Sequence, residues 1–212
     1  MQIEQATADH PWWIAPAGEL LETACGSGYI TNSELLSLAA TDDSEIIIAH
    51  GPAGLLGVAI VAIADEVVRT QLNRTMSALG LAENTTADET VGWLRAVVVD
   101  PSVRGQRIGS RTVEAGLDFL RQKRCGTVYA ASWISGTDQQ SEGMLTRTGF
   151  AALGVIPNYW SEVVDYHGAC AVCGTACRCS ATIMRTNIEP ATGTAVAPGR
   201  ENSSSGSPSH VS

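Results

Sequence analysis

Three arginines crowd into the short segment "RGQRIGSR", at positions 104, 107 and 111, in a chain whose formal net charge is -9. Two glycines, Gly105 and Gly109, lie among them. Free backbone N–H groups at a helix N-terminus bind phosphate, arginine side chains add charge-assisted hydrogen bonds, and glycine lets a ligand approach the backbone. The segment therefore predicts a phosphate-binding turn. The plainer interpretation is a basic turn whose arginines pair with surface carboxylates.

Four of the six cysteines stand close together in "CAVCGTACRC", at Cys170, Cys173, Cys177 and Cys179. A C-x2-C pair followed by glycine is typical of a tetrahedral thiolate site, and the second pair, with one intervening residue, fits that pattern less well. Structural zinc is the first interpretation, and an iron–sulfur cluster or free redox-active thiols are the alternatives. Disulfides are disfavoured because we expect a cytoplasmic protein.

The elements around the arginine turn are a strand and a helix. The β-branched run "AVVVD" at 96–100 precedes the turn, and Val113, Leu117 and Leu120 then recur on one helical face after Gly109. A strand, a glycine-rich turn and a helix thus follow one another, which places the arginines at the helix N-terminus.

The rest of the chain alternates between short strands and helices. Two helices are expected at 8–25 and 32–41, a hairpin at 44–64, and a surface excursion without periodicity at about 71–90. The other expected elements are strands at 2–7, 91–100, 127–134, 152–156 and 180–186, and a helix within 139–150.

Composition limits the possible functions. The chain has 212 residues, enough for one domain, and its 13 Lys+Arg against 22 Asp+Glu argue against nucleic-acid or anionic-membrane partners. We find neither a signal peptide nor a long apolar run, and therefore expect a cytoplasmic protein. Residues 1–186 are expected to form the domain, and the Gly/Ser/Pro-rich segment 187–212 a disordered tail. A homodimer is possible.

The segment "VVVDPSVRGQRIGSRTVEAGLDFL" resembles motif A of the GNAT superfamily of N-acetyltransferases, whose pattern is Arg/Gln-x-x-Gly-x-Gly/Ala. Arg107 stands where that pattern has its first glycine. The order of elements from residue 2 to about 186 also resembles the family. The resemblance implies an α/β (α+β) GNAT fold, in which a mixed, mostly antiparallel sheet splays between its fourth and fifth strands and is flanked by helices.

The resemblance also implies a binding mode for acetyl-CoA. The pantetheine arm would lie between "RAVVVD" and "YAASWI" and pair with the backbone of the first of these strands. The pyrophosphate would rest on the amides of the arginine turn. The residues expected to contact acetyl-CoA are Val97, Val98, Val99, Arg104, Gly105, Gln106, Arg107, Ile108, Gly109 and Ser110.

Catalytic residues are less evident. Family members often carry a tyrosine that protonates the thiolate and a glutamate base, and the matching positions here hold Leu145 and Trp133. A backbone N–H near Val98 or Val99 would stabilise the oxyanion. The remaining weak candidates for proton transfer are Glu142, Tyr159 and Tyr166.

The cysteines belong to an insertion at 167–180 between the last two strands, which the family pattern lacks. We expect a metal there to be structural and remote from the thioester. The implied function is an acetyl-CoA-dependent N-acetyltransferase acting on a small-molecule or peptide amine. The alternative is a non-catalytic acyl-CoA-binding sensor, or a metal-stabilised interaction protein with the same fold.

Overall fold

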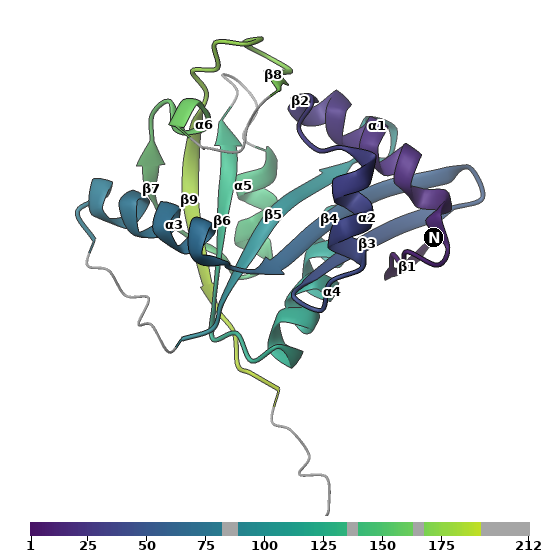
Figure 1. Cartoon of the computed structure of the whole chain (residues 1–212), viewed down its shortest axis with the longest axis horizontal. Coiled ribbons are helices and arrows are strands. Elements are labelled where there is room, and N and C mark those ends of the chain that lie inside the picture. Colours follow the sequence, from purple (N-terminus) through teal and green to yellow (C-terminus); the bar gives the residue numbers. More distant parts are fainter. Residues whose placement is uncertain (82–88, 135–139, 163–167, 192–212) are drawn as a thin grey trace, which may run out of the picture.

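A computed structural model describes residues 1–81, 89–134, 140–162 and 168–191. A twisted sheet of seven strands runs through the molecule, with helices on both faces (Figure 1). Its strands are β1 (Gln2–Gln5), β3 (Ser44–Gly51), β4 (Gly54–Ile63), β5 (Val91–Val99), β6 (Thr127–Ile134), β7 (Ala151–Ile156) and β9 (Ser180–Asn187). Two short strands, β2 (Gly26–Ser27) and β8 (Ala169–Cys170), pair with each other apart from this sheet.

The strand order in the sheet is β1-β3-β4-β5-β6-β9-β7. Every neighbouring pair is antiparallel except β5 and β6, which run parallel. The last long strand, β9, inserts between β6 and β7. The predicted mixed, mostly antiparallel sheet is therefore confirmed, and so are the hairpin formed by β3 and β4 and the placement of the cysteines between the last two long strands.

The helices are α1 (Ile14–Cys25), α2 (Asn32–Ala39), α3 (Glu66–Ala78), α4 (Ile108–Gln122), α5 (Gln140–Arg147) and the short α6 (Tyr159–Glu162). One core cluster joins α1 and α2 to Ala96 and Val98 of β5, whereas another joins α4 to Leu94 of the same strand. Val97, between Ala96 and Val98, also packs against the α4 cluster, and because side chains alternate along a strand, α1 and α2 cover one face of the sheet and α4 covers the other.

Local sequence explains the helix boundaries. Thr31 forms a capping box at the start of α2: its hydroxyl accepts from the Glu34 amide at 3.2 Å, and the Glu34 carboxylate accepts from the Thr31 amide at 2.7 Å. Helix α4, which is strongly amphipathic, buries Val113, Leu117 and Leu120 as predicted.

The prediction of a surface excursion from about residue 71 is wrong for its first part. Helix α3 continues to Ala78 and begins at an Asp65 cap, whose carboxylate accepts from the Val68 amide at 2.8 Å. It buries Leu72, Thr75 and Met76 against the sheet. Spacings of three and four residues between these side chains are helical, but threonine in the middle weakens the apolar signal.

The chain packs a short way beyond the strand that was expected to end at 186. Asn187 is the last residue of β9, and Ile188 is buried in the core while its amide donates to the Gly126 carbonyl at 2.9 Å. Residues 192–212, which make up most of the predicted tail, lie outside the described residues. Among the helices described, none combines the length and apolar character that a membrane crossing requires.

Candidate functional site

The two parallel strands in the middle of the sheet stay together for only half of their length. Strand β5 pairs with β6 from Val91 to Leu94, yet it continues to Val99. Beyond the last pair the strands diverge and leave a cleft of about 960 Å³ that is lined by both of them, by the turn before α4, by α5 and by the cysteine segment. The predicted splay of the sheet is thus confirmed.

A β-bulge marks the point where the splay begins. Ile60 of β4 is opposite Ala96, and the next residue, Val61, is opposite Leu94, so Arg95 is the extra residue on β5. A bulge bends its strand and releases backbone groups from the ladder. The Tyr29 hydroxyl, from the segment between α1 and α2, donates to the Arg95 carbonyl at 3.1 Å. This hydrogen bond ties the bulge to the segment between α1 and α2.

Backbone amides of β5 face the cleft beyond the bulge. The Asp100 amide donates to the Leu56 carbonyl of β4 at 2.9 Å. Because amides alternate between the two edges of a strand, those of Val97 and Val99 point away from β4, toward the side that β6 has left. By the same alternation the Val98 amide points toward β4. The geometry favours Val97 and Val99 over Val98 as donors to a bound ligand.

The turn between β5 and α4 has the conformation of an anion site. Asp100 closes a short 3-10 turn by accepting from the Ser102 amide at 2.8 Å, and Gly105 follows with φ of 80°. Helix α4 then begins at Ile108, and its first residues line one end of the cleft. The backbone amides of this first turn have no partner within the helix and are therefore available to a ligand. Arg104 and Arg107 line the same end.

Arg107 caps this helix in the left-handed conformation, with φ of 60° and ψ of 19°. A residue with a Cβ atom is strained there by about 1–2 kcal/mol, which explains why the family pattern has glycine at this place. We expect Arg107→Gly to raise the free energy of unfolding by about 0.5–1 kcal/mol, since part of the relief is offset by the greater freedom of glycine in the unfolded chain.

The same substitution removes a positive charge, so acetyl-CoA should bind a few-fold more weakly. Chemical denaturation and calorimetric titration measure the two effects separately. Lower stability of the Arg107→Gly protein would show that the arginine side chain contributes more to the fold than its backbone strain costs.

The weak proton-transfer candidates lie away from the cleft or outside the described chain. Tyr159 is 4% exposed, packs with Ala181 and Ile183, and is not among the residues that line the cleft. Burial raises the pKa of its phenol to about 12. Glu142 accepts from the Thr182 hydroxyl at 2.8 Å and likewise does not line the cleft. Tyr166 lies outside the described residues.

Leu145 and Trp133, which occupy the positions of the family's usual acid and base, do line the cleft. Sequence reasoning missed a hydroxyl pair beside them: Ser132 of β6 and Ser141 of α5 are 2.7 Å apart, and both line the cleft. Ser141 stands four residues before Leu145, so the two side chains share one face of α5. Serine is so common in protein sequences that residue type alone could not have identified this pair as part of the site.

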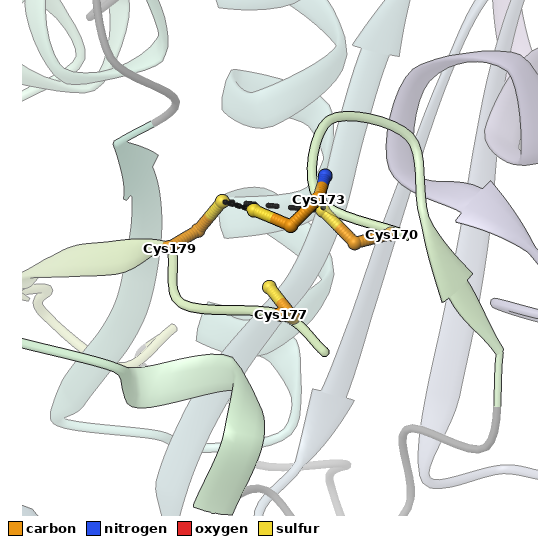
Figure 2. Close-up of side chains that lie close together, drawn as sticks. All are labelled: Cys170, Cys173, Cys177 and Cys179. Atoms are coloured by element: carbon orange, nitrogen blue, oxygen red, sulfur yellow. Dashed lines mark hydrogen bonds between the residues drawn. The ribbon is translucent and has the colours of Figure 1, made fainter. Parts of the chain in front are cut away.

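The four clustered cysteines converge in space, and their sulfur atoms point toward one another (Figure 2). All four lie within 4.8 Å of one another, with 3.9 Å between the sulfurs of Cys170 and Cys179 and 3.2 Å between those of Cys173 and Cys179. Cys173 is exposed, and the other three are buried. The predicted grouping of these residues is therefore present in the fold.

The first cysteine pair forms a tight knuckle. The amides of Val172 and Cys173 each donate to the Cys170 sulfur at 3.4 Å. Cys170 and Gly174 exchange two backbone hydrogen bonds, and Gly174 has φ of 71°, which glycine adopts without strain. A hydrogen bond from the Arg178 amide lowers the pKa of the Cys173 thiol, whereas burial raises the pKa of Cys177.

Contrary to the expectation of a remote cysteine segment, this segment borders the cleft between β5 and β6. Cys170, Ala171, Val172 and Cys177 line the same cleft as β5 and the α4 turn. Strand β8 reaches across to β2, pairing Cys170 with Gly26, and the Ala171 amide donates to the Cys25 carbonyl at 3.3 Å. The cysteine segment thus joins the N-terminal helices to the far half of the sheet and forms a wall of the cleft.

Comparisons with known proteins agree with this geometry. The model of the acetyltransferase (GNAT) family matches residues 12–150. No curated protein sequence matches the chain. Similar solved structures include a ribosomal-protein-alanine N-acetyltransferase from Brucella melitensis, with a TM-score of 0.59 and 14% identity over 89% of this chain and 100% of that one.

Two further structures have the same TM-score of 0.59. An aminoglycoside 6'-acetyltransferase type Ii is 16% identical over 90% of this chain and 99% of its own. The NatC complex bound to Gag peptide and CoA is 11% identical over 89% and 99%. At these identities the likeness establishes the fold, whereas the family match covers well over half of the chain. The sheet, the splayed strands and the turn before α4, together with that match, identify the chain as a member of the GNAT acetyltransferase family.

Proposed function

We propose that the protein transfers an acetyl group from acetyl-CoA to an amine of a small molecule or peptide. The observation that carries this proposal is the cleft between β5 and β6, which ends at the α4 turn. An extended pantetheine arm pairs along β5 through the Val97 and Val99 amides. The pyrophosphate rests on the amides from Arg104 to Ser110.

The chemistry follows from these placements. The acceptor amine, after losing its proton to solvent, attacks the thioester carbonyl; a C–N bond forms and the C–S bond breaks. A cleft-facing amide of β5, from Val97 or Val99, donates to the oxygen that becomes negative in the tetrahedral intermediate. As the C–S bond breaks, the nitrogen of the intermediate gives its surplus proton to water, and the departing CoA thiolate takes a proton from water. Acetylated product and free thiol are therefore released in equal amounts, which a thiol assay and mass spectrometry measure together.

Ser141 is the side chain that we propose to assist the departing thiolate, because its hydroxyl lies in the cleft one turn from the family's acid position. We expect Ser141→Ala to lower kcat by about tenfold, since a hydrogen bond to a charged group contributes about 1.5–3 kcal/mol. Acetyl-CoA affinity should not change. Thr146→Ala, on the exposed side of the same helix, is the matched control. An unchanged kcat in Ser141→Ala would leave water as the sole partner of the thiolate.

We also propose that Cys170, Cys173, Cys177 and Cys179 bind one zinc ion. With Zn–S bonds of about 2.3 Å, tetrahedral geometry separates the sulfurs by about 3.8 Å. The measured spread, from 3.2 Å between two sulfurs to within 4.8 Å for all four, needs only small side-chain rotations to match that value. An iron–sulfur cluster uses the same four ligands and remains the alternative, distinguished by its visible absorption and by metal analysis.

A second function has a specific observation in its favour. Among the described residues that line the cleft, none is an aspartate, glutamate or histidine. Burial raises the pKa of the Cys25 thiol, which also lines it, to about 12, so this group stays protonated at neutral pH. A cleft without a side-chain base suits a non-catalytic acyl-CoA sensor as well as an enzyme that uses solvent. Turnover separates the two functions.

A further inference from the structure

We infer that Arg95 is a specificity-determining residue that binds a carboxylate of the acceptor. This inference rests on the proposed function, because it assigns the chemical class of the acceptor in the same cleft. It predicts that the preferred substrate is an amine that also carries a negative charge, and that polycationic amines are poor substrates.

The position of Arg95 is unusual. It is the bulged residue of β5, one position beyond Leu94, where pairing with β6 ends. The residues on either side of Arg95 pack in different core clusters: Leu94 packs with α4, and Ala96 packs with α1. Arg95 belongs to neither cluster, and it lines the cleft. The bulge thus presents an arginine where a regular strand residue would pack against the core.

The guanidinium of Arg95 has no partner within the described chain. The carboxylate ion pairs there join Glu4 to His50 and Asp118 to Arg121. The Arg95 side chain also forms no hydrogen bond with any described residue, although Arg95 is partly buried. A charge that is partly removed from water is costly unless it is paired. In a chain with 22 acidic residues, an unpaired arginine in a cleft indicates that the counter-charge comes from a ligand.

Acetyl-CoA does not supply that counter-charge. Val99 is four positions after Arg95, which corresponds to about 13 Å along a strand. The pyrophosphate site at the α4 turn begins beyond Val99 and has its own arginines, Arg104 and Arg107. The part of acetyl-CoA that lies beside the bulge is the uncharged pantetheine and thioester. The acceptor is therefore the partner that brings an anion to Arg95.

The residues that line the cleft restrict the chemical class of the acceptor further. Tyr29, Trp133 and Trp160 line it together with Val172, a residue of the cysteine segment that is 60% exposed. No carboxylate occurs among the described lining residues, so the cleft offers no carboxylate partner to a second ammonium group. An amine with one carboxylate and an apolar or aromatic body fits these walls, and arginine binds a carboxylate through two parallel hydrogen bonds.

The test compares acids with their carboxamides. Binding to the CoA-saturated protein is measured by calorimetry for L-phenylalanine, L-phenylalanyl-glycine and 4-(aminomethyl)benzoate, each paired with its amide, so that the distance between amine and carboxylate varies. We expect at least one acid to bind about tenfold more tightly than its amide. Arg95→Gln should reduce that ratio below about twofold, while Arg95→Lys keeps part of it, because lysine retains the charge without the planar fork.

Arg121→Gln is the matched control, since Arg121 pairs with Asp118 outside the cleft. Equal binding of every acid and its amide, or a preference that survives Arg95→Gln, would overturn the inference. So would an equal loss of acid and amide binding together with a lower unfolding temperature, because that result assigns Arg95 a structural role. If acids bind preferentially but no thiol is released, the proposed transfer is contradicted and the role of Arg95 is not. If thiol is released but acids are not preferred, the role of Arg95 is contradicted and the proposed transfer is not.

Discussion

Removal of metal under reducing conditions is expected to weaken acceptor binding by about tenfold or more while acetyl-CoA binding changes by less than about twofold. The cysteine segment forms one wall of the cleft and is tied to α1 through β2 and β8. Without an ion the four cysteines lose the common ligand that joins them, so the segment loses its geometry. The backbone groups of β5 and of the turn before α4 that are proposed to bind acetyl-CoA do not depend on the cysteine segment.

Cys179→Ser tests the same point without a chelator. Metal analysis of the purified wild type should give one zinc per chain, and the variant should lose it together with stability, since structural zinc contributes about 10 kcal/mol or more in small domains. Cys125→Ala is the control, because Cys125 is buried in a different core cluster. Absence of zinc and iron from anaerobically purified protein, with all four thiols freely titratable, would contradict the proposed site.

Gly109→Val is expected to abolish acetyl-CoA binding. A Cβ atom on Gly109 would already stand 3.3 Å from a Val99 methyl and 3.7 Å from Met144, in the packed corner where α4 starts beside β5. The two further methyl groups of valine have to displace the helix start or project over its amides. In wild type, acetyl-CoA at about a hundred times its dissociation constant adds about 2.7 kcal/mol of stability, and this gain should vanish in the variant.

Because Gly109→Val places a branched side chain in a packed site, its folding is checked by circular dichroism without ligand. Gly109→Ala adds one methyl group and is the milder companion, expected to fold and to bind more weakly. Gly126 has no positive φ, and an added Cβ atom there would meet only a Glu89 carboxylate oxygen at 3.7 Å, so the same substitution at this glycine outside the cleft is the matched control. A folded Gly109→Val protein with wild-type affinity would show that the phosphate does not rest on the α4 amides.

The parts of the fold that sequence predicted are those with strong periodicity or special turn residues. Helix α4 shows three regularly spaced core residues, and Gly105 precedes it at a positive φ. The start of α3 was missed because its first turns are largely polar and its burial depends on Leu72 and Met76 meeting the sheet. The sequence pattern shows which side of a helix is apolar, but tertiary packing decides whether a weakly apolar side is buried.

The site was predictable where backbone geometry defines it and not where single side chains do. The turn before α4 follows from residue types, and the splay of the sheet is what the resemblance to the GNAT family implies. The bulge at Arg95 involves one residue within a β-branched run, and only the shift of register between Ile60 and Val61 reveals it. The location of the cysteines in the cleft wall depends on a two-residue pairing of β8 with β2, which is too short to leave a periodic pattern.

The most direct test of the central claim is thiol release from acetyl-CoA by the zinc-loaded full chain with a panel of amines, with the acetylated product identified by mass spectrometry. We predict that at least one amine yields thiol and acetylated product in equal amounts, and that Gly109→Val abolishes both. Saturable binding of acetyl-CoA with no thiol release for any amine would contradict an acetyltransferase and leave an acyl-CoA sensor in its place.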